Sequence, residues 1–73
     1  MTPTATAKQR LTTFLIERRG HNFCDACAGR GIGIDPSTAY RAAAKTMQAT
    51  GFVREYALCS DCGVSRLITR ATG

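Results

Sequence analysis

Residues 24–27 read Cys-Asp-Ala-Cys and residues 59–63 read Cys-Ser-Asp-Cys-Gly, and these two stretches decide the fold of the chain. A Cys-x-x-Cys turn places two sulfurs on one ion, and structural zinc takes four such ligands in a tetrahedron. The first pair opens a predicted helix, whose amide end stabilises thiolates, and Gly63 lets the backbone curl round the metal. We therefore expect one structural Zn2+ per chain, held by Cys24, Cys27, Cys59 and Cys62.

Other uses of the cysteines stay open at this point. The four thiols could instead form two local or crossed disulfides, or serve a redox reaction. A thioredoxin-like motif needs a βαβ context, and no long strand precedes Cys24. His21 is a further candidate ligand, but four thiolates already complete the shell, so we expect it at the surface or at a cap. Because a catalytic zinc keeps one coordination position open, the filled shell predicts that the protein is not an enzyme.

Length and charge restrict the class of protein. Residues 1–73 are expected to form a single domain, with residues 1–5 flexible, and a chain this short needs a metal or disulfides to supplement its core. The net charge of +5 and the pI of about 9.5 favour a polyanionic partner. No signal peptide and no bilayer-length apolar run is visible, so we expect a cytoplasmic protein without a membrane partner, a setting in which paired cysteines bind metal more often than they form disulfides.

The order of elements is predicted from hydrophobic periodicity and from turn residues. Asp35 is a good N-cap, Pro36 suits the first position of a helix, and Gly51 suits its end. The expected class is α+β, three helices followed by a two-stranded hairpin, joined by the four-cysteine zinc site. The elements are expected as a helix over 5–19, an extended link over 21–23, a short helix over 24–30, a helix over 36–50, and strands over 52–58 and 64–69.

Each main element has an expected core face. The first helix has an apolar stripe of Leu11, Phe14 and Leu15, which the stem of Arg18 extends. In the third helix the expected apolar stripe is Tyr40, Ala43, Ala44 and Met47, and the polar face is Ser37, Arg41, Lys45 and Gln48. In the first strand of the hairpin the expected apolar face is Phe52, Tyr56 and Leu58.

The sequence resembles a family of small bacterial winged helix-turn-helix proteins. The resemblance rests on the element order and on three segments, Phe23–Cys27, Cys59–Gly63 and the Leu-Ile-Thr-Arg ending of residues 67–70. In such a protein the third helix, here residues 35–50, is the recognition helix and the hairpin is the wing. The resemblance implies that zinc ties the second helix to the tip of the wing.

The resemblance also implies a function, a DNA-binding module that acts as a small transcriptional regulator on double-stranded DNA. Arg41 would then pair with a guanine edge and Gln48 with an adenine edge. The implied nucleic-acid contacts are Ser37, Thr38, Arg41, Lys45 and Gln48 on the third helix, and Arg54 and Arg66 in the wing.

Two alternatives stay open: a zinc-stapled protein-interaction domain that binds no nucleic acid, and RNA or ribosome association. No small-molecule substrate is evident. Nucleic acid is favoured if Arg41, Lys45, Arg54 and Arg66 share one face of the molecule.

Overall fold

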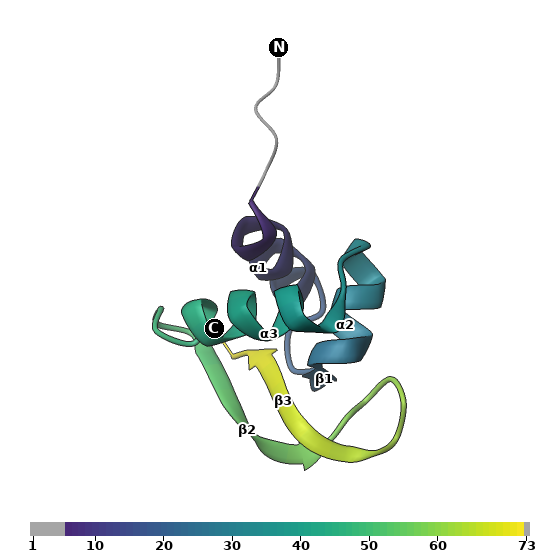
Figure 1. Ribbon diagram of the computed structural model, residues 1–73. Helices are drawn as coiled ribbons and strands as arrows, with labels where there is room; N and C mark the ends of the chain where they lie inside the picture. Colours follow the sequence, from purple (N-terminus) through teal and green to yellow (C-terminus); the bar gives the residue numbers. More distant parts are fainter. Residues whose placement is uncertain (1–5, 73) are drawn as a thin grey trace.

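The computed structural model describes residues 6–72 as three helices and one three-stranded antiparallel sheet (Figure 1). The helices are α1 (Ala7–Glu17), α2 (Asp25–Ile32) and α3 (Pro36–Thr46), and the strands are β1 (Phe23–Cys24), β2 (Phe52–Leu58) and β3 (Ser65–Ala71). The expected α+β class is confirmed. The expected flexibility of residues 1–5 lies outside the described residues. Among residues 6–72, no helix combines the length and the apolar character that crossing a bilayer requires.

Helix α1 presents the apolar face that its sequence predicts. Thr6 caps the helix by accepting a hydrogen bond from the backbone N–H of Gln9, whose side chain accepts one in return from the Thr6 N–H. Leu11, Phe14 and Leu15 are buried in the main core cluster. Arg18 covers the end of the stripe, with its guanidinium 4.0 Å from the centre of the Phe14 ring.

The connection between α2 and α3 depends on two glycines. Gly33 ends α2 in the left-handed region, at a φ of 76°, where side chains are disfavoured. Gly29 permits the close approach of α3, because a Cβ at this position would lie 2.8 Å from the Ile34 carbonyl oxygen and 3.2 Å from the Ala39 Cβ. Asp35 then caps α3 by accepting a hydrogen bond from the Thr38 N–H, as expected from the sequence.

The expected core face of α3 is confirmed at Ala43, but the buried face is shifted by about one position along the helix, so the expectation is wrong for Tyr40 and Met47. The buried residues are small: Ala39, Ala42, Ala43 and Thr46. Tyr40 is 55% exposed and Met47 is 45% exposed. The physical reason is the packing distance, because α3 lies against both α1 and α2 and only small side chains fit between the helices.

Helix α3 is also shorter than the expected 36–50. It ends at Thr46, whose hydroxyl donates to the Ala42 carbonyl at 2.8 Å. The N–H groups of Gln48 and Ala49 then bond to carbonyls three residues back, which tightens the chain into turns. Gln48 therefore lies beyond the helix on which it was expected.

The sheet has the strand order β1-β3-β2. Strand β1 was expected only as an extended link, but it pairs with β3, with Phe23 opposite Thr69 and Cys24 opposite Ile68. A two-residue strand has no periodicity that sequence could show, so its pairing is decided by β3. Phe23 packs against both the helical core cluster and the cysteine cluster and so joins the two.

Strands β2 and β3 pair over their full lengths, from Phe52 opposite Ala71 to Leu58 opposite Ser65, and we call them the β2–β3 ribbon. Figure 1 shows this ribbon extending away from the helices below α3. Only Phe52 of the expected apolar face packs against the core. Tyr56 is 81% exposed and Leu58 is 59% exposed, so the expectation was wrong for both residues, because the helices do not cover this part of the ribbon.

The close approach at Gly29 predicts a stability effect. We expect Gly29→Val to lower the free energy of unfolding by about 1–3 kcal/mol, because the added side chain meets backbone atoms that cannot turn away. Urea denaturation followed by circular dichroism measures the change. Arg30→Ala is the matched control on the exposed side of α2 and should change stability by no more than about 0.5 kcal/mol. Equal stability of the two variants would contradict the close packing of α2 and α3.

Candidate metal centre

The four cysteines converge on one point from two distant parts of the chain. Cys24 ends β1 and Cys27 lies in the first turn of α2, whereas Cys59 and Cys62 lie in the loop that joins β2 to β3. Their sulfurs all lie within 4.8 Å of one another. Three of the four residues are buried and Cys62 is exposed. This donor set could hold a metal ion.

The separation of the sulfurs suits a tetrahedral ion. Metal–sulfur bonds of about 2.3 Å place tetrahedral ligands about 3.8 Å apart. The Sγ atoms of Cys24 and Cys62 lie 3.9 Å apart. All four cysteines are free thiols in the structure, which does not contain the alternative disulfides. His21 is exposed and is not part of the sulfur cluster.

Hydrogen bonds from Asn22 hold the second cysteine pair in place. The Asn22 backbone N–H donates to the Ser60 hydroxyl at 3.0 Å, and its side-chain amide donates to the Leu58 carbonyl at 3.0 Å. The Ser60 N–H donates in return to the Asn22 carbonyl at 2.8 Å. The approach of the two pairs therefore has protein contacts of its own. Sequence reasoning did not identify Asn22, whose only signal was its position directly before Phe23-Cys24.

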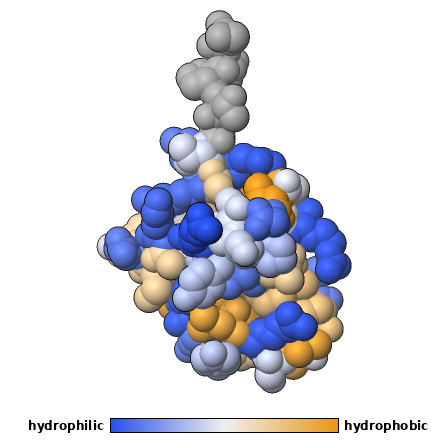
Figure 2. All heavy atoms as spheres, viewed as in Figure 1, coloured by the Kyte–Doolittle hydropathy of each residue, from blue (hydrophilic) through white to orange (hydrophobic). Residues whose placement is uncertain are grey.

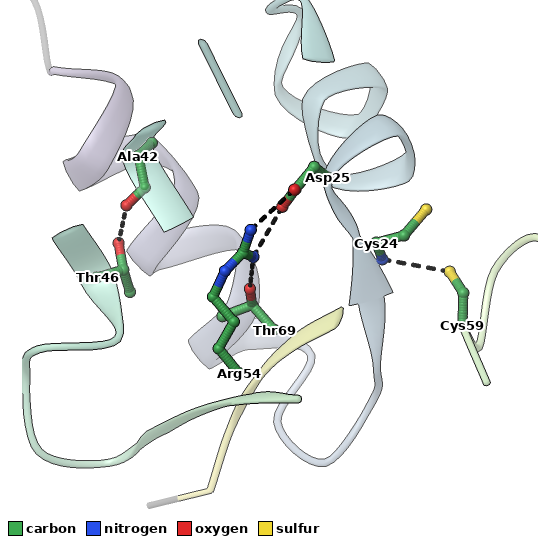
Figure 3. A network of polar contacts seen from close by, with 7 residues as sticks. All are labelled: Cys24, Asp25, Ala42, Thr46, Arg54, Cys59 and Thr69. Atoms are coloured by element: carbon green, nitrogen blue, oxygen red, sulfur yellow. Dashed lines mark hydrogen bonds and ion pairs between the residues drawn. The ribbon is translucent and has the colours of Figure 1, made fainter. Parts of the chain in front are cut away.

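Backbone N–H groups stabilise the thiolate form of one of the four cysteines, Cys59. Burial alone would raise the pKa of Cys59, but the backbone N–H groups of Cys62, Cys24 and Asp61 stabilise its thiolate and lower the pKa to about 6. The Cys24 N–H lies 3.4 Å from the Cys59 sulfur (Figure 3). Burial raises the pKa of Cys24 and of Cys27 above the ordinary value. A bound cation reverses this effect of burial, because it deprotonates the thiols that coordinate it.

An ion pair ties the first cysteine pair to the β2–β3 ribbon. The guanidinium of Arg54 donates two hydrogen bonds of 2.9 Å to the carboxylate of Asp25, which lies next to Cys24. It also donates to the Thr69 hydroxyl at 2.8 Å (Figure 3). The Arg54 side chain is only 5% exposed. The pairing of Asp25 with Arg54 was not predicted from the sequence.

The structure separates the expected nucleic-acid contacts into two groups. Arg41 and Arg66 line one surface hollow of about 500 Å3, together with Ser37. Arg41 also lines a second hollow of about 390 Å3, together with Lys45 and Lys8. Four cations thus follow one another along α1, α3 and β3, and we call Lys8, Arg41, Lys45 and Arg66 the basic band. The position of Lys8 next to Arg41 and Lys45 was not predicted, because no sequence signal places the start of α1 beside α3.

The other expected contacts are placed differently. Arg54 is buried in its ion pair, so its guanidinium is not presented to a phosphate. Thr38 is half-buried and its hydroxyl donates to the Asp35 carboxylate at 2.6 Å, as part of the α3 cap. Gln48 is exposed but lies past the end of α3.

Comparison with protein-family models, curated proteins and solved structures finds no match for this chain.

The sulfur cluster predicts one bound metal ion per chain. Structural ions of this kind contribute about 10–16 kcal/mol in small peptides, which exceeds the roughly 3–5 kcal/mol expected from a core of this size. We expect Cys24→Ser and Cys59→Ser to lose both the metal and the folded structure, as measured by elemental analysis and circular dichroism. Asp61→Ala, in the same loop, should keep both. A folded wild-type protein without metal and with four free thiols would contradict the site.

The burial of Arg54 predicts that this arginine stabilises the fold. Arg54→Ala leaves Asp25 partly buried without its partner, so we expect the free energy of unfolding to fall by about 3–5 kcal/mol. Arg66→Ala, at an exposed position, should change it by about 0.5 kcal/mol at most. Combining Arg54→Met with Asp25→Asn should recover much of the loss. Wild-type stability of Arg54→Ala in urea would show that the ion pair is not structural.

Proposed function

We propose that this chain is a nucleic-acid-binding module of the winged helix-turn-helix type, a small transcriptional regulator and not an enzyme, which binds double-stranded DNA. In this proposal α3 is the recognition helix and the β2–β3 ribbon is the wing. The observation that carries the proposal is the basic band, in which Arg41 lines one hollow together with Arg66 and a second hollow together with Lys45.

The charges of the basic band are available to a partner. Within residues 6–72, none of its four cations lies within salt-bridge distance of a carboxylate. Among the described residues that line the two hollows, Asp25 is the one acidic residue, and Arg54 balances its charge. A group of cations without acidic partners on neighbouring elements is the electrostatic footprint of a protein that neutralises phosphates.

The geometry of α3 supports the same proposal. Ser37, Arg41 and Lys45 recur every four residues along the helix and are all exposed. The alanines on the opposite face bind α3 to the helical core, so the polar face is turned outward. An exposed helix with cations at this spacing suits the major groove, where arginine reads guanine and lysine contacts phosphate.

In this proposal the metal is zinc, and its role is structural. Four thiolates in a closed tetrahedral shell are typical of structural zinc, which has no preferred geometry of its own and no redox chemistry. The ion would join the start of α2 to the loop of the β2–β3 ribbon, and so would hold the wing in a constant position relative to α3.

A specific observation favours a second candidate, a protein-interaction domain. Three apolar side chains are exposed near the outer end of the β2–β3 ribbon: Tyr56 and Leu58 in β2, and Val64 in the loop before β3. Apolar groups clustered on a surface commonly mark contacts between proteins. This surface lies outside the residues that line the two hollows of the basic band, so separate variants can test the two candidates.

The basic band predicts a salt-dependent affinity for duplex DNA. Each phosphate that a cation neutralises adds about −0.9 to the slope of log affinity against log salt. We expect Lys45→Ala to make this slope shallower by about one unit and to weaken all sequences alike. Arg41→Ala, if Arg41 reads a base, should cost about 1–3 kcal/mol at the preferred sequence and little elsewhere. Fluorescence anisotropy over a range of salt concentrations measures both effects.

Arg19 and Arg30 provide the matched controls, because both are exposed and neither lines the hollows of the basic band. Alanine variants at these positions should alter the slope far less than Lys45→Ala does. Equal, small effects at all four positions, or an affinity for duplex DNA weaker than millimolar at low salt, would reject DNA binding. Loss of a protein partner in Leu58→Ser would then favour the second candidate.

A further inference from the structure

The hollow between α3 and β3 contains apolar and aromatic side chains in addition to the cations that would bind phosphate. It measures about 500 Å3, and its lining includes the side chains of Tyr40 and Leu67 as well as Arg41 and Arg66. We call it the Tyr40 hollow. Figure 2 shows hydrophobic residues interleaved with hydrophilic ones on the lower part of the same view, where Figure 1 places the β2–β3 ribbon. The hollow thus offers apolar walls and cations to one ligand.

The exposed aromatic ring of Tyr40 is the feature of this hollow that suggests a bound ligand. Tyr40 is 55% exposed although it is one of the largest side chains on α3, and it was expected in the core. The Arg54 guanidinium lies 5.3 Å from the centre of its ring. Because Arg54 is itself fixed by Asp25 and Thr69, the Tyr40 ring rests on a rigid support.

Aromatic rings and cations in one place are typical of sites that bind unpaired nucleotides. A base stacks on the aromatic face while arginines follow the backbone phosphates. Paired bases inside a duplex present their edges to the grooves, since their faces are covered by the neighbouring pairs. An exposed aromatic ring therefore cannot stack on the bases of a fully paired duplex, but it can stack on the face of an unpaired base.

We propose that the Tyr40 hollow binds an unpaired nucleobase, which stacks on Tyr40, while Arg66 contacts its flanking phosphate. Leu67 supplies the apolar wall beside the base. This inference rests on the proposed function and specifies the DNA that is preferred. The preferred partner is a duplex that continues into a single strand. Its paired part would lie along the basic band, and its first unpaired base would lie in the Tyr40 hollow.

The test compares a blunt DNA duplex with the same duplex carrying a short single-stranded tail, using the full chain with its metal. Wild-type protein should bind the tailed probe about 5- to 150-fold more tightly than the blunt one, the range expected for stacking one base on an aromatic ring. Tyr40→Leu should lose most of this preference and Tyr40→Phe should keep it. A 2-aminopurine placed in the tail should be quenched by wild type and by Tyr40→Phe but not by Tyr40→Leu.

Two controls separate stacking from charge and from misfolding. Tyr40→Leu removes no cation, so the salt slope for the tailed probe should stay unchanged, whereas Lys45→Ala makes it shallower. Tyr56→Leu removes an exposed tyrosine that does not line the Tyr40 hollow, and it should keep the preference for the tail. Metal content and circular dichroism show that each variant is folded.

The outcomes distinguish this inference from the proposed function. Equal affinity of the wild type for both probes would overturn the inference and leave duplex binding intact. A tail preference that survives in folded Tyr40→Leu would also overturn it. No binding of either probe would overturn both, and binding of the tailed probe alone would support the Tyr40 hollow while rejecting the blunt duplex as a partner.

Discussion

The convergence of four cysteine sulfurs is the constraint on which the rest of the structure depends. It brings the junction of β1 and α2 to the loop of the β2–β3 ribbon, two regions that the whole of α3 separates in sequence. The core that remains is small, because α3 contributes mainly alanines to it. A domain of this size buries too little apolar surface to be stable through its core alone, so we expect the sulfur cluster and its contacts to stabilise the fold.

Arg54 connects the region of the first cysteine pair to the outer face of α3. Its guanidinium joins Asp25, beside the first cysteine pair, to Thr69 in the middle of the sheet. It also lies against the ring of Tyr40. One buried arginine thus links α2, both strands of the β2–β3 ribbon and α3, and it sets the position of an aromatic side chain at the surface.

The packing of the helices decides which charges reach the surface together. Small residues on the inner face of α3, and Gly29 on α2, allow the helices to approach closely. This closeness turns Tyr40, Arg41 and Lys45 outward and places Lys8 of α1 beside Arg41 and Lys45. The same alanine-rich face that makes the core small therefore produces the basic band and the Tyr40 hollow.

The sequence by itself predicted the three helices, the two long strands and the four cysteines that meet. The cap residue Asp35 and the period of the α1 stripe are local signals, and a Cys-x-x-Cys spacing is a chemical one, so neither kind needs the fold to be known. Contacts between distant segments leave no such signal. Only the tertiary structure turned Arg54 inward and brought Lys8 to α3, because both depend on which surfaces pack and at what distance. The exposure of Tyr40 was decided in the same way: helical periodicity shows that one face is buried, but the space between the helices selects the alanines for it.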